Sequence, residues 1–122
     1  MNTDKKTLMY REYYKTPDIH VREDGNAVYR YYKGDYQCGS LPVRPPTFLK
    51  IHSDKKTGKR YIKTRDYGIA YIDRMVARCF CHKPEGADFL IHVDGNEENC
   101  HKNNLKWVDY QTYNMIMATR NP

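Results

Sequence analysis

Apolar and polar residues alternate along much of the first 72 positions of the chain, and Gly-containing turns interrupt the alternation. A period of two is typical of half-buried β-strands, and two such runs on either side of a short turn indicate a hairpin. The pattern predicts strands at 19–22, 27–32, 48–52, 60–65 and 69–72, turns at 23–26, 54–59 and 66–68, and a Gly- and Pro-containing loop at 33–46. The first half of the chain is therefore predicted to be strand-rich.

The period changes to that of a helix after residue 71. Apolar residues then recur at spacings of three and four, at Ile72, Met75, Val76, Cys79 and Phe80. This spacing places them on one face of a helix. Two short apolar strands are predicted at 89–93 and 105–108, and a last helix follows Asp109, a suitable N-cap residue, through 117. The predicted fold class is α+β: a small antiparallel strand module followed by helix, strand, loop, strand and helix.

A length of 122 residues predicts a single domain, 1–122. Within it we expect a polar arm at 1–17, a strand-rich basic module at 18–71, the helical unit at 72–117 and a tail at 118–122. The chain has no run of about 18 apolar residues, and its polar start leads into no apolar segment. We therefore expect no transmembrane helix, no signal peptide and no membrane partner. The four cysteines fit a reducing, cytoplasmic location as free thiols.

The net charge of +6 is distributed unevenly along the chain. Residues 44–83 contain 11 Lys or Arg and 3 Asp or Glu, a net charge of +8, whereas residues 84–109 contain 2 and 6, a net charge of −4. The basic part suits phosphate groups, and the acidic part, which is rich in His and Asn, suits a cation. Twelve tyrosines are compatible with a nucleic-acid partner. Charged turns on a solvated surface would give the same totals, so charge alone establishes no partner.

Two short motifs near the C-terminal end carry the candidate chemistry. His92-Val93-Asp94-Gly95-Asn96 begins within the first predicted strand of the unit, and Asn104-Leu105-Lys106-Trp107-Val108 forms the second. Upstream, residues 72–80 read Ile-Asp-Arg-Met-Val-Ala-Arg-Cys-Phe. In sequence and spacing, these segments resemble the HNH endonuclease family of phages and homing endonucleases, in which a strand-rich module commonly precedes the motif. The resemblance covers most of residues 19–115 and is most specific from 72 to 115.

The resemblance implies a ββα-metal unit that hydrolyses phosphodiester bonds of DNA. His92 would be the general base that deprotonates water, since imidazole is a good base near neutral pH. Asn104 would orient the strand that carries His92. Asn114, on the last helix, would bind one divalent cation, Mg²⁺ or Mn²⁺, and Asp94 is a further candidate ligand. A phage-type protein of this kind would act in the cytoplasm of a bacterial host cell.

Two positions depart from the family pattern. The residue before the histidine is usually a metal ligand, but here it is Ile91, which cannot bind a cation. The spacing from Trp107 to Asn114 is one residue longer than expected, and one residue turns a side chain by about 100° on a helix. Asp73, at a position where the family commonly has His, could approach the site instead. The second hypothesis is therefore a catalytically inactive HNH-fold protein that binds nucleic acid or acts as a phage structural or interaction protein.

Seven basic residues lie on the strands, the turn and the helix that lead into the motif. They are Lys50, Lys59, Arg60, Lys63, Arg65, Arg74 and Arg78. Their positions favour contacts with the phosphate groups of DNA. Zinc is a less favoured hypothesis, because adjacent Cys-His pairs make tetrahedral ligation by four side chains awkward. The ligands of such a site would be Cys81, His82, Cys100 and His101.

Overall fold

The structure is a computed structural model that describes residues 7–31 and 47–120. Its strands are β1 (Tyr10–Glu12), β2 (Ile19–Arg22), β3 (Val28–Arg30), β4 (Thr47–Phe48), β5 (His52–Ser53), β6 (Arg60–Thr64), β7 (Gly68–Tyr71), β8 (Phe89–His92) and β9 (Leu105–Val108). The helices are α1 (Ile72–Phe80), the short 3₁₀ helix η2 (Lys102–Asn104) and α2 (Tyr110–Arg120). Among the described residues, no helix is both long and apolar enough to cross a bilayer.

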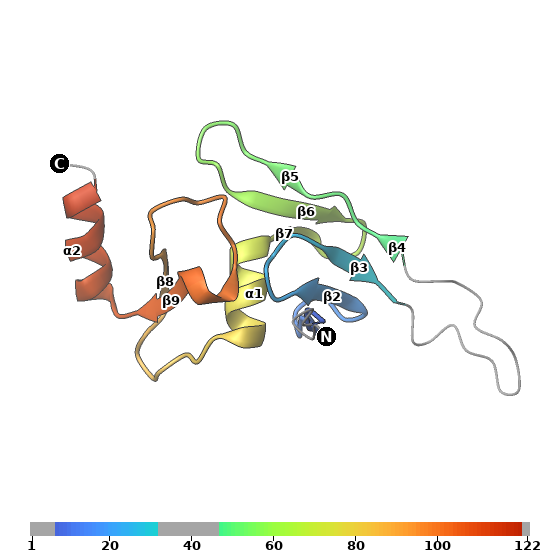
Figure 1. The fold of residues 1–122 in the computed structure, drawn as a ribbon, viewed down its shortest axis with the longest axis horizontal. Helices are drawn as coiled ribbons and strands as arrows, with labels where there is room; N and C mark the ends of the chain where they lie inside the picture. The colour runs from blue at the N-terminus through green and yellow to red at the C-terminus, as the bar shows by residue number, and fades with distance from the viewer. Residues whose placement is uncertain (1–6, 32–46, 121–122) are drawn as a thin grey trace, which may run out of the picture.

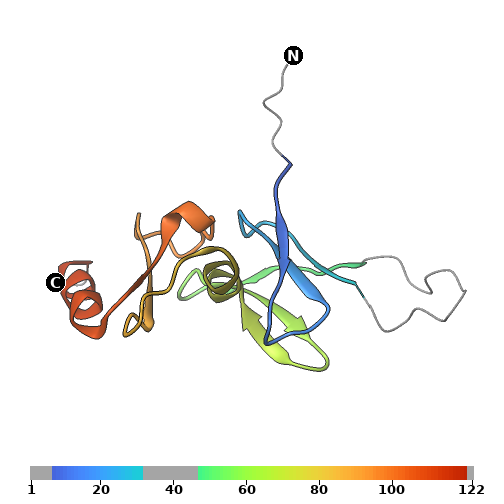
Figure 2. The same cartoon turned by 90° about the horizontal axis from the view of Figure 1, so that it is seen from below.

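The strands form three antiparallel sheets, which confirms the predicted α+β class. The strand orders are β1-β2-β3-β4, β5-β6-β7 and β8-β9. Helix α1 lies between the strand-rich module and the β8–β9 hairpin, and α2 lies at the far end of the molecule beside the C-terminus (Figures 1 and 2). The predicted order of helix, strand, loop, strand and helix is therefore present from residue 72 onward.

The core is built from alternate strand positions and the apolar face of α1. Its fully buried apolar side chains include Ile19, Val21, Val28, Ile62, Ile72, Met75 and Val76. Each buried aliphatic side chain of this size stabilises the fold by about 1.5–3 kcal/mol relative to an exposed one. Cys79 and Phe80 pack against the same cluster from the last turn of α1. The helical spacing read from the sequence therefore marks the face that joins α1 to the strands.

The strand predicted at 48–52 is divided between two sheets. Phe48 pairs with Tyr29 of β3, whereas His52 pairs with Tyr61 of β6. Alternation within one segment carries no information about its partner, so the sequence could not show this change of sheet. In the segment expected to be a polar arm, β1 pairs with β2 and Tyr13 is buried. The expected loop at 33–46, residue 32 at the end of the strand expected at 27–32, residues 1–6 of the expected arm and residues 121–122 of the tail lie outside the described residues.

The turn between β2 and β3 supports the loop that connects β8 and β9. Gly25 has a φ of 74°, and a Cβ at this position would lie 2.6 Å from Cys100 Cβ, so only glycine fits. Beside it, Lys102 Nζ lies 2.6 Å from Glu23 Oε1, and the Lys102 N–H donates to the Glu23 carbonyl at 2.9 Å. The strand-rich module thereby fixes the position of the loop that carries most of the predicted site.

Candidate functional site

Asp73 and His92 meet between the first turn of α1 and the end of β8. Asp73 is the second residue of α1, and its side chain is buried beside that of His92, which is 2% exposed. His92 Nε2 lies 2.9 Å from Asp73 Oδ2. The second carboxylate oxygen, Oδ1, accepts the backbone N–H of Arg74 at 2.6 Å. The Asp73 carboxylate therefore stands directly against the predicted general base.

The imidazole of His92 is held from both sides by hydrogen-bond acceptors. Nδ1 lies 3.1 Å from the Asn99 carbonyl oxygen, and Nε2 faces the Asp73 carboxylate. A neutral imidazole has one N–H, so only the doubly protonated ring satisfies both acceptors. Burial alone would lower the pKa of His92, but the hydrogen bond to Asp73 and the charge of Glu97 raise it above its ordinary value. The resting site therefore favours the imidazolium form.

Glu97 and Lys59 complete the cluster from two different loops. Glu97 Oε1 lies 3.6 Å from His92 Nε2 and 3.0 Å from Lys59 Nζ. Lys59 Nζ also lies 3.6 Å from Asp73 Oδ2. Burial would lower the pKa of Lys59, but its ion-pair contact with Glu97 and the charge of Asp73 raise it. We call these four side chains, Lys59, Asp73, His92 and Glu97, the acidic cluster, because two carboxylates converge on its centre.

The acidic cluster has the donor set of a site for one hard cation. One ligand atom from each of Asp73, His92 and Glu97 lies within 4.8 Å of the others. Glu97 Oε1 is buried and has an ion-pair contact, yet within the described part of the chain it accepts no hydrogen bond of good geometry. The carboxylate oxygens of Asp73 and Glu97 suit Mg²⁺ or Mn²⁺, and a buried oxygen without a hydrogen bond gains most from such an ion. The residues present therefore fit a divalent metal.

Asn104 and Asp94 form a second network behind the imidazole. Asn104 Oδ1 accepts the Asp94 backbone N–H at 3.0 Å, and its Nδ2 donates to Asp94 Oδ1 and to the Asn99 carbonyl, both at 2.9 Å. The Asn99 carbonyl oxygen is thus shared by Asn104 and His92. Hydrogen bonds from Asn99, from the Asn96 backbone and from Asn104 lower the pKa of Asp94 to about 2. Asn104 is placed to position His92, and the Asp94 carboxylate is occupied by amides.

Ile91 and Asn114 lie outside the acidic cluster. Ile91 is buried, and it points to the face of β8 opposite His92 because successive strand residues alternate. Asn114 is exposed on α2. The side of α2 that touches the hairpin is marked by the ring of Tyr113, 5.1 Å from Phe89, and by Arg120 Nη2, which donates to the Val93 carbonyl at 3.0 Å. Asn114 follows Tyr113 by one residue, so it is rotated about 100° around the helix.

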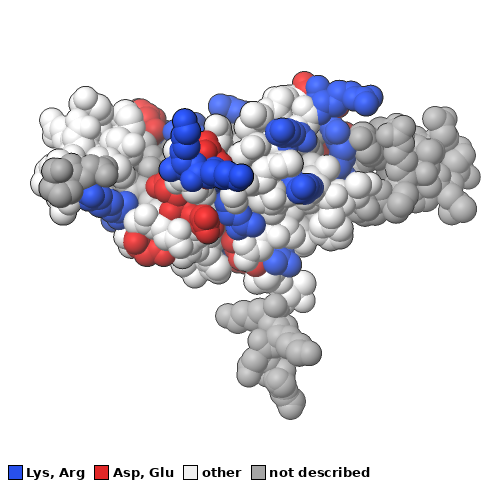
Figure 3. All heavy atoms as spheres, turned by 90° about the horizontal axis from the view of Figure 1, so that it is seen from above, with Lys and Arg blue, Asp and Glu red and all other residues white. Residues whose placement is uncertain are grey.

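The predicted phosphate-binding residues divide into two groups. Lys50, Lys63, Arg65, Arg74 and Arg78 are exposed, whereas Lys59 and Arg60 are half-buried. Arg60 donates to Asn26 Oδ1 at 2.8 Å, and the exposed Arg78 lies over the Trp107 ring at 5.1 Å. Figure 3 shows acidic side chains gathered between α2 and the strand-rich module, with Lys and Arg side chains beside them and over the module. Lys59 belongs to the acidic cluster and not to the freely exposed cations.

The cysteine and histidine residues considered for zinc do not come together. In the described ranges 7–31 and 47–120, the group Asp73, His92 and Glu97 is the one set of three or more metal-ligand side chains in range of one another. Cys81 Sγ lies 3.4 Å from the Lys102 carbonyl oxygen, and Cys100 Sγ lies 3.8 Å from that of Glu97. Burial raises the pKa of Cys100 to about 12, so this thiol stays protonated.

The sequence did not identify two members of the acidic cluster as neighbours of His92: Glu97 was not assigned to the site, and Lys59 was assigned only to phosphate binding. Glu97 reads as one acid of a charged loop, and Lys59 as one cation of a basic turn. Asp73 carries a weak signal, because it stands where the resembling family commonly has histidine. Only the fold brings Lys59 to within 3.0 Å of a carboxylate 38 positions later in the chain.

Comparisons with known proteins show which fold the chain resembles. No protein-family model matches the sequence, and no curated protein matches it. Among solved structures, the chain is similar to one that describes DNA binding and cleavage by the HNH homing endonuclease I-HmuI, with a TM-score of 0.67 and 22% sequence identity. The similarity covers 92% of this chain and 59% of that one, so this chain spans less than two thirds of the length of its neighbour. The fold is therefore HNH-like.

Proposed function

We propose that this chain is a metal-dependent DNA endonuclease of the HNH type, and that His92 is its general base. The observation that carries the proposal is the convergence of Asp73 and Glu97 on His92 Nε2, at 2.9 and 3.6 Å. This convergence supplies the carboxylate ligand that Ile91 cannot provide. It also gives an HNH-like hairpin that lacks the usual metal ligand before the histidine a set of oxygen donors beside the imidazole.

The residues of the chain have separate tasks in this proposal. The Asn99 carbonyl holds the Nδ1 proton of His92, which leaves Nε2 as the atom that accepts a proton from water. Asn104 fixes that carbonyl through its own amide, so it is a positioning residue. Asp73 and Glu97 would hold the cation, and a bound Mg²⁺ or Mn²⁺ would supply positive charge that stabilises the phosphate oxygens during hydrolysis. Engagement of Asp73 with a cation would also remove the acceptor that keeps His92 protonated.

Lys59 and Glu97 form the accessible side of the acidic cluster. Their side chains are 43% and 29% exposed, whereas those of Asp73 and His92 are 7% and 2% exposed. A phosphate that attracts the Lys59 ammonium group away from the carboxylates would open the cluster toward the substrate. Without a substrate, the Lys59 ammonium group balances the charge of the cluster, because it neutralises the Asp73 and Glu97 carboxylates, which would otherwise repel each other.

The test is a plasmid-nicking assay in Mg²⁺ and in Mn²⁺, with wild type, His92→Ala and His82→Ala. His82 is the matched control, because it is an exposed histidine outside the acidic cluster. We expect wild type and His82→Ala to nick the plasmid, and His92→Ala to be slower by about 10²–10⁴-fold, as for loss of a general base. Circular dichroism checks that both variants are folded.

Two results would overturn parts of the proposal. If wild type leaves the plasmid intact in both metals, the chain is not an endonuclease, and the hypothesis of an inactive HNH-fold protein that binds nucleic acid takes its place. That hypothesis has one observation in its favour, since Lys59 lies 3.0 Å from Glu97 and 3.6 Å from Asp73, between the carboxylates. If His92→Ala nicks as fast as wild type, the assignment of the base is wrong even though the activity is real.

A further inference from the structure

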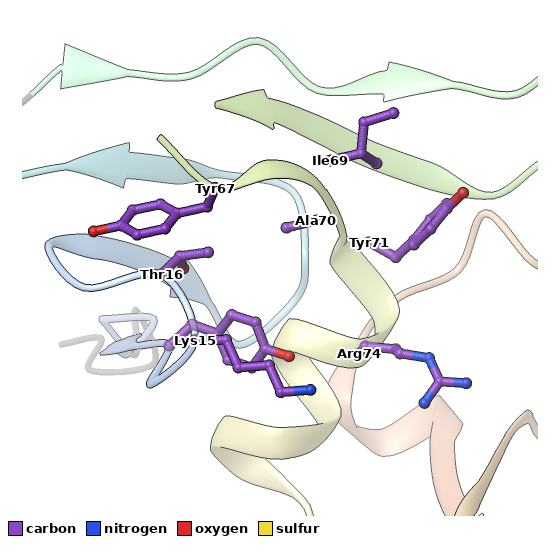
Figure 4. A pocket seen from close by; sticks show the side chains of 8 residues that line it. Lys15, Thr16, Tyr67, Ile69, Ala70, Tyr71 and Arg74 are labelled. Atoms are coloured by element: carbon purple, nitrogen blue, oxygen red, sulfur yellow. The ribbon is translucent and has the colours of Figure 1, made fainter. Parts of the chain in front are cut away.

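A pocket lies on the other side of the first turn of α1 from the acidic cluster. It encloses about 370 Å³ between the loop after β1, strand β7 with the turn before it, and α1. Three tyrosines, two cations and a threonine contribute to its wall: Tyr13, Tyr67, Tyr71, Lys15, Arg74 and Thr16. Apolar residues of β7 lie between the rings of Tyr67 and Tyr71, as Figure 4 shows. The combination of aromatic walls and cations is not used by the proposed nuclease site.

The tyrosines of the pocket offer flat apolar surface to a ligand. Tyr67 and Tyr71 are 40% and 41% exposed, which is high for such large side chains. The Tyr67 hydroxyl donates to the Pro17 carbonyl at 3.4 Å, and the Tyr71 ring contacts that of Tyr61 at 6.1 Å between centroids. These contacts hold the rings at fixed positions while leaving part of each uncovered. Nucleobases stack on exposed tyrosine rings of this kind without regard to sequence.

Two cations line the pocket on the side away from Tyr67. Among the described residues, neither Lys15 nor Arg74 forms an ion pair, although Lys15 Nζ lies 5.8 Å from the centre of the Tyr14 ring. In Figure 4 both charged groups lie along the same edge of the pocket, below the tyrosine rings. An anion bound at that edge would be met by a guanidinium and an ammonium group together, an arrangement typical of phosphate binding.

A buried hydroxyl group provides an independent sign of a missing ligand. Thr16 is 3% exposed and lines the pocket, and its Oγ1 has no hydrogen-bond partner among the residues that the structure describes. Leaving a buried hydroxyl unpaired costs free energy, and such groups in folded proteins are nearly always paired. A hydroxyl can both donate and accept, so it suits the mixed polar edge of a nucleobase.

The pocket and the acidic cluster share one turn of α1. Asp73 contacts His92, and the next residue, Arg74, lines the pocket. Consecutive Cα atoms lie about 3.8 Å apart, and consecutive helical side chains diverge by about 100°. The first turn of α1 therefore places the pocket next to the acidic cluster, with Arg74 at the edge of the one and Asp73 in the other.

We propose that this pocket binds one unstacked nucleotide of a single-stranded or locally opened DNA segment. The base would pack against the wall formed by Tyr71, Tyr67 and the apolar side chains between them, with its edge toward Thr16, and its phosphate would lie against Lys15 and Arg74. The inference rests on the proposed function in taking DNA as the ligand, but not in requiring cleavage. It adds a substrate feature, namely a preference for unpaired nucleotides beside the scissile bond.

The test is a metal-free binding experiment with two probes in the presence of a chelator. One probe is a fluorescent eight-nucleotide single-stranded DNA, and the other is an abasic deoxyribose-phosphate chain of the same length. Stacking of one base is worth about 1–3 kcal/mol, which corresponds to roughly 5–150-fold in affinity. We expect wild type to bind the base-bearing probe more tightly by a factor in this range. Tyr71→Leu should remove that difference and leave binding of the abasic probe unchanged.

Two further variants make the result specific. Arg74→Gln should weaken both probes to a similar extent, because it removes a phosphate contact. Tyr110→Leu is the matched control, since Tyr110 is 61% exposed on α2 and lies outside the pocket. It should behave as wild type. Circular dichroism and thermal unfolding of each variant separate loss of binding from loss of fold, and Tyr67→Leu repeats the test if Tyr71→Leu is unstable.

Several outcomes would overturn the inference. Equal affinity of wild type for both probes excludes a base in the pocket, and an equal loss on both probes in Tyr71→Leu assigns the tyrosine a structural role. Competition by inorganic phosphate as strong as that by a mononucleotide would reduce the site to an anion site. None of these outcomes depends on cleavage. Failure of the pocket and failure of the endonuclease proposal, which is read from plasmid nicking, are therefore distinguishable.

Discussion

The acidic cluster and the exposed face of the strand-rich module use charged side chains in opposite ways. In the cluster, Asp73 and His92 are buried and contact each other at 2.9 Å. On β6 and the turn after it, Lys63 and Arg65 are exposed, and in the described part of the chain neither forms an ion pair. The geometry of a buried cluster is set by the protein itself, whereas exposed cations take their geometry from an external partner. The acidic cluster therefore suits a reaction at a single phosphate group, and the exposed basic face suits contact with the phosphate backbone of DNA.

The largest effect is expected from breaking the buried region at Asp73. Asp73→Asn keeps the shape of the side chain but removes the charge that faces His92 and that would hold the cation. We expect plasmid nicking to fall by at least about 100-fold, and the affinity for Mn²⁺, measured by calorimetry, to fall as well. Asp88→Asn is a suitable control, because Asp88 is exposed and pairs with Lys83 at 2.6 Å. Unchanged nicking and Mn²⁺ binding in Asp73→Asn would show that this carboxylate is no ligand.

The exposed region should respond to charge reversal without loss of catalysis. Lys63→Glu combined with Arg65→Glu should weaken DNA binding and lower the slope of log affinity against log salt concentration by about 2, roughly 1 for each lost phosphate contact. The rate of nicking at saturating DNA should stay near that of wild type, because both residues lie outside the acidic cluster. An affinity for DNA that is independent of salt in wild type would contradict this assignment of the basic face.

The sequence predicted the elements of the strand-rich module and α1 better than it predicted the contacts within the acidic cluster. The helical spacing of Ile72, Met75 and Val76 predicted α1 and its buried face, and the hairpins were predicted because alternation and turns are local signals. The division of 48–52 between two sheets could not be predicted, since a partner strand is not encoded in the segment itself. The roles proposed for His92 and Asn104 followed from the resemblance and stay predictions. The contact of Lys59 with Glu97 depends on the complete fold, and no periodicity reports it.

The raised pKa of His92 makes the stability of the buried region depend on pH. A group whose pKa is higher in the folded protein contributes stability that is complete below its unfolded value, here 6.5, and is lost as pH rises through the folded pKa. We therefore expect the free energy of unfolding to fall from pH 6 upward, measured by denaturant titration. In Asp73→Asn the decline should shrink and the His92 ring should titrate at lower pH by NMR. An unchanged His92 titration in that variant would contradict the pairing.

The smallest effect, and the finest test of the comparison, comes from Lys59, which has properties of both regions. It is half-exposed like the basic face, yet its ammonium group lies 3.0 Å from Glu97 and 3.6 Å from Asp73. Lys59→Met should change stability by no more than about 1 kcal/mol, because solvent screens a partly exposed ion pair. The affinity of the Lys59→Met variant for Mn²⁺ should rise several-fold, because the ammonium group that competes for the carboxylates is gone. Lys63→Met, the control, should leave Mn²⁺ binding unchanged. If Lys59→Met instead lowers Mn²⁺ affinity as much as Asp73→Asn, the ammonium group organises the carboxylates rather than competing with the metal ion for them, and Lys59 is a positioning residue of the metal site.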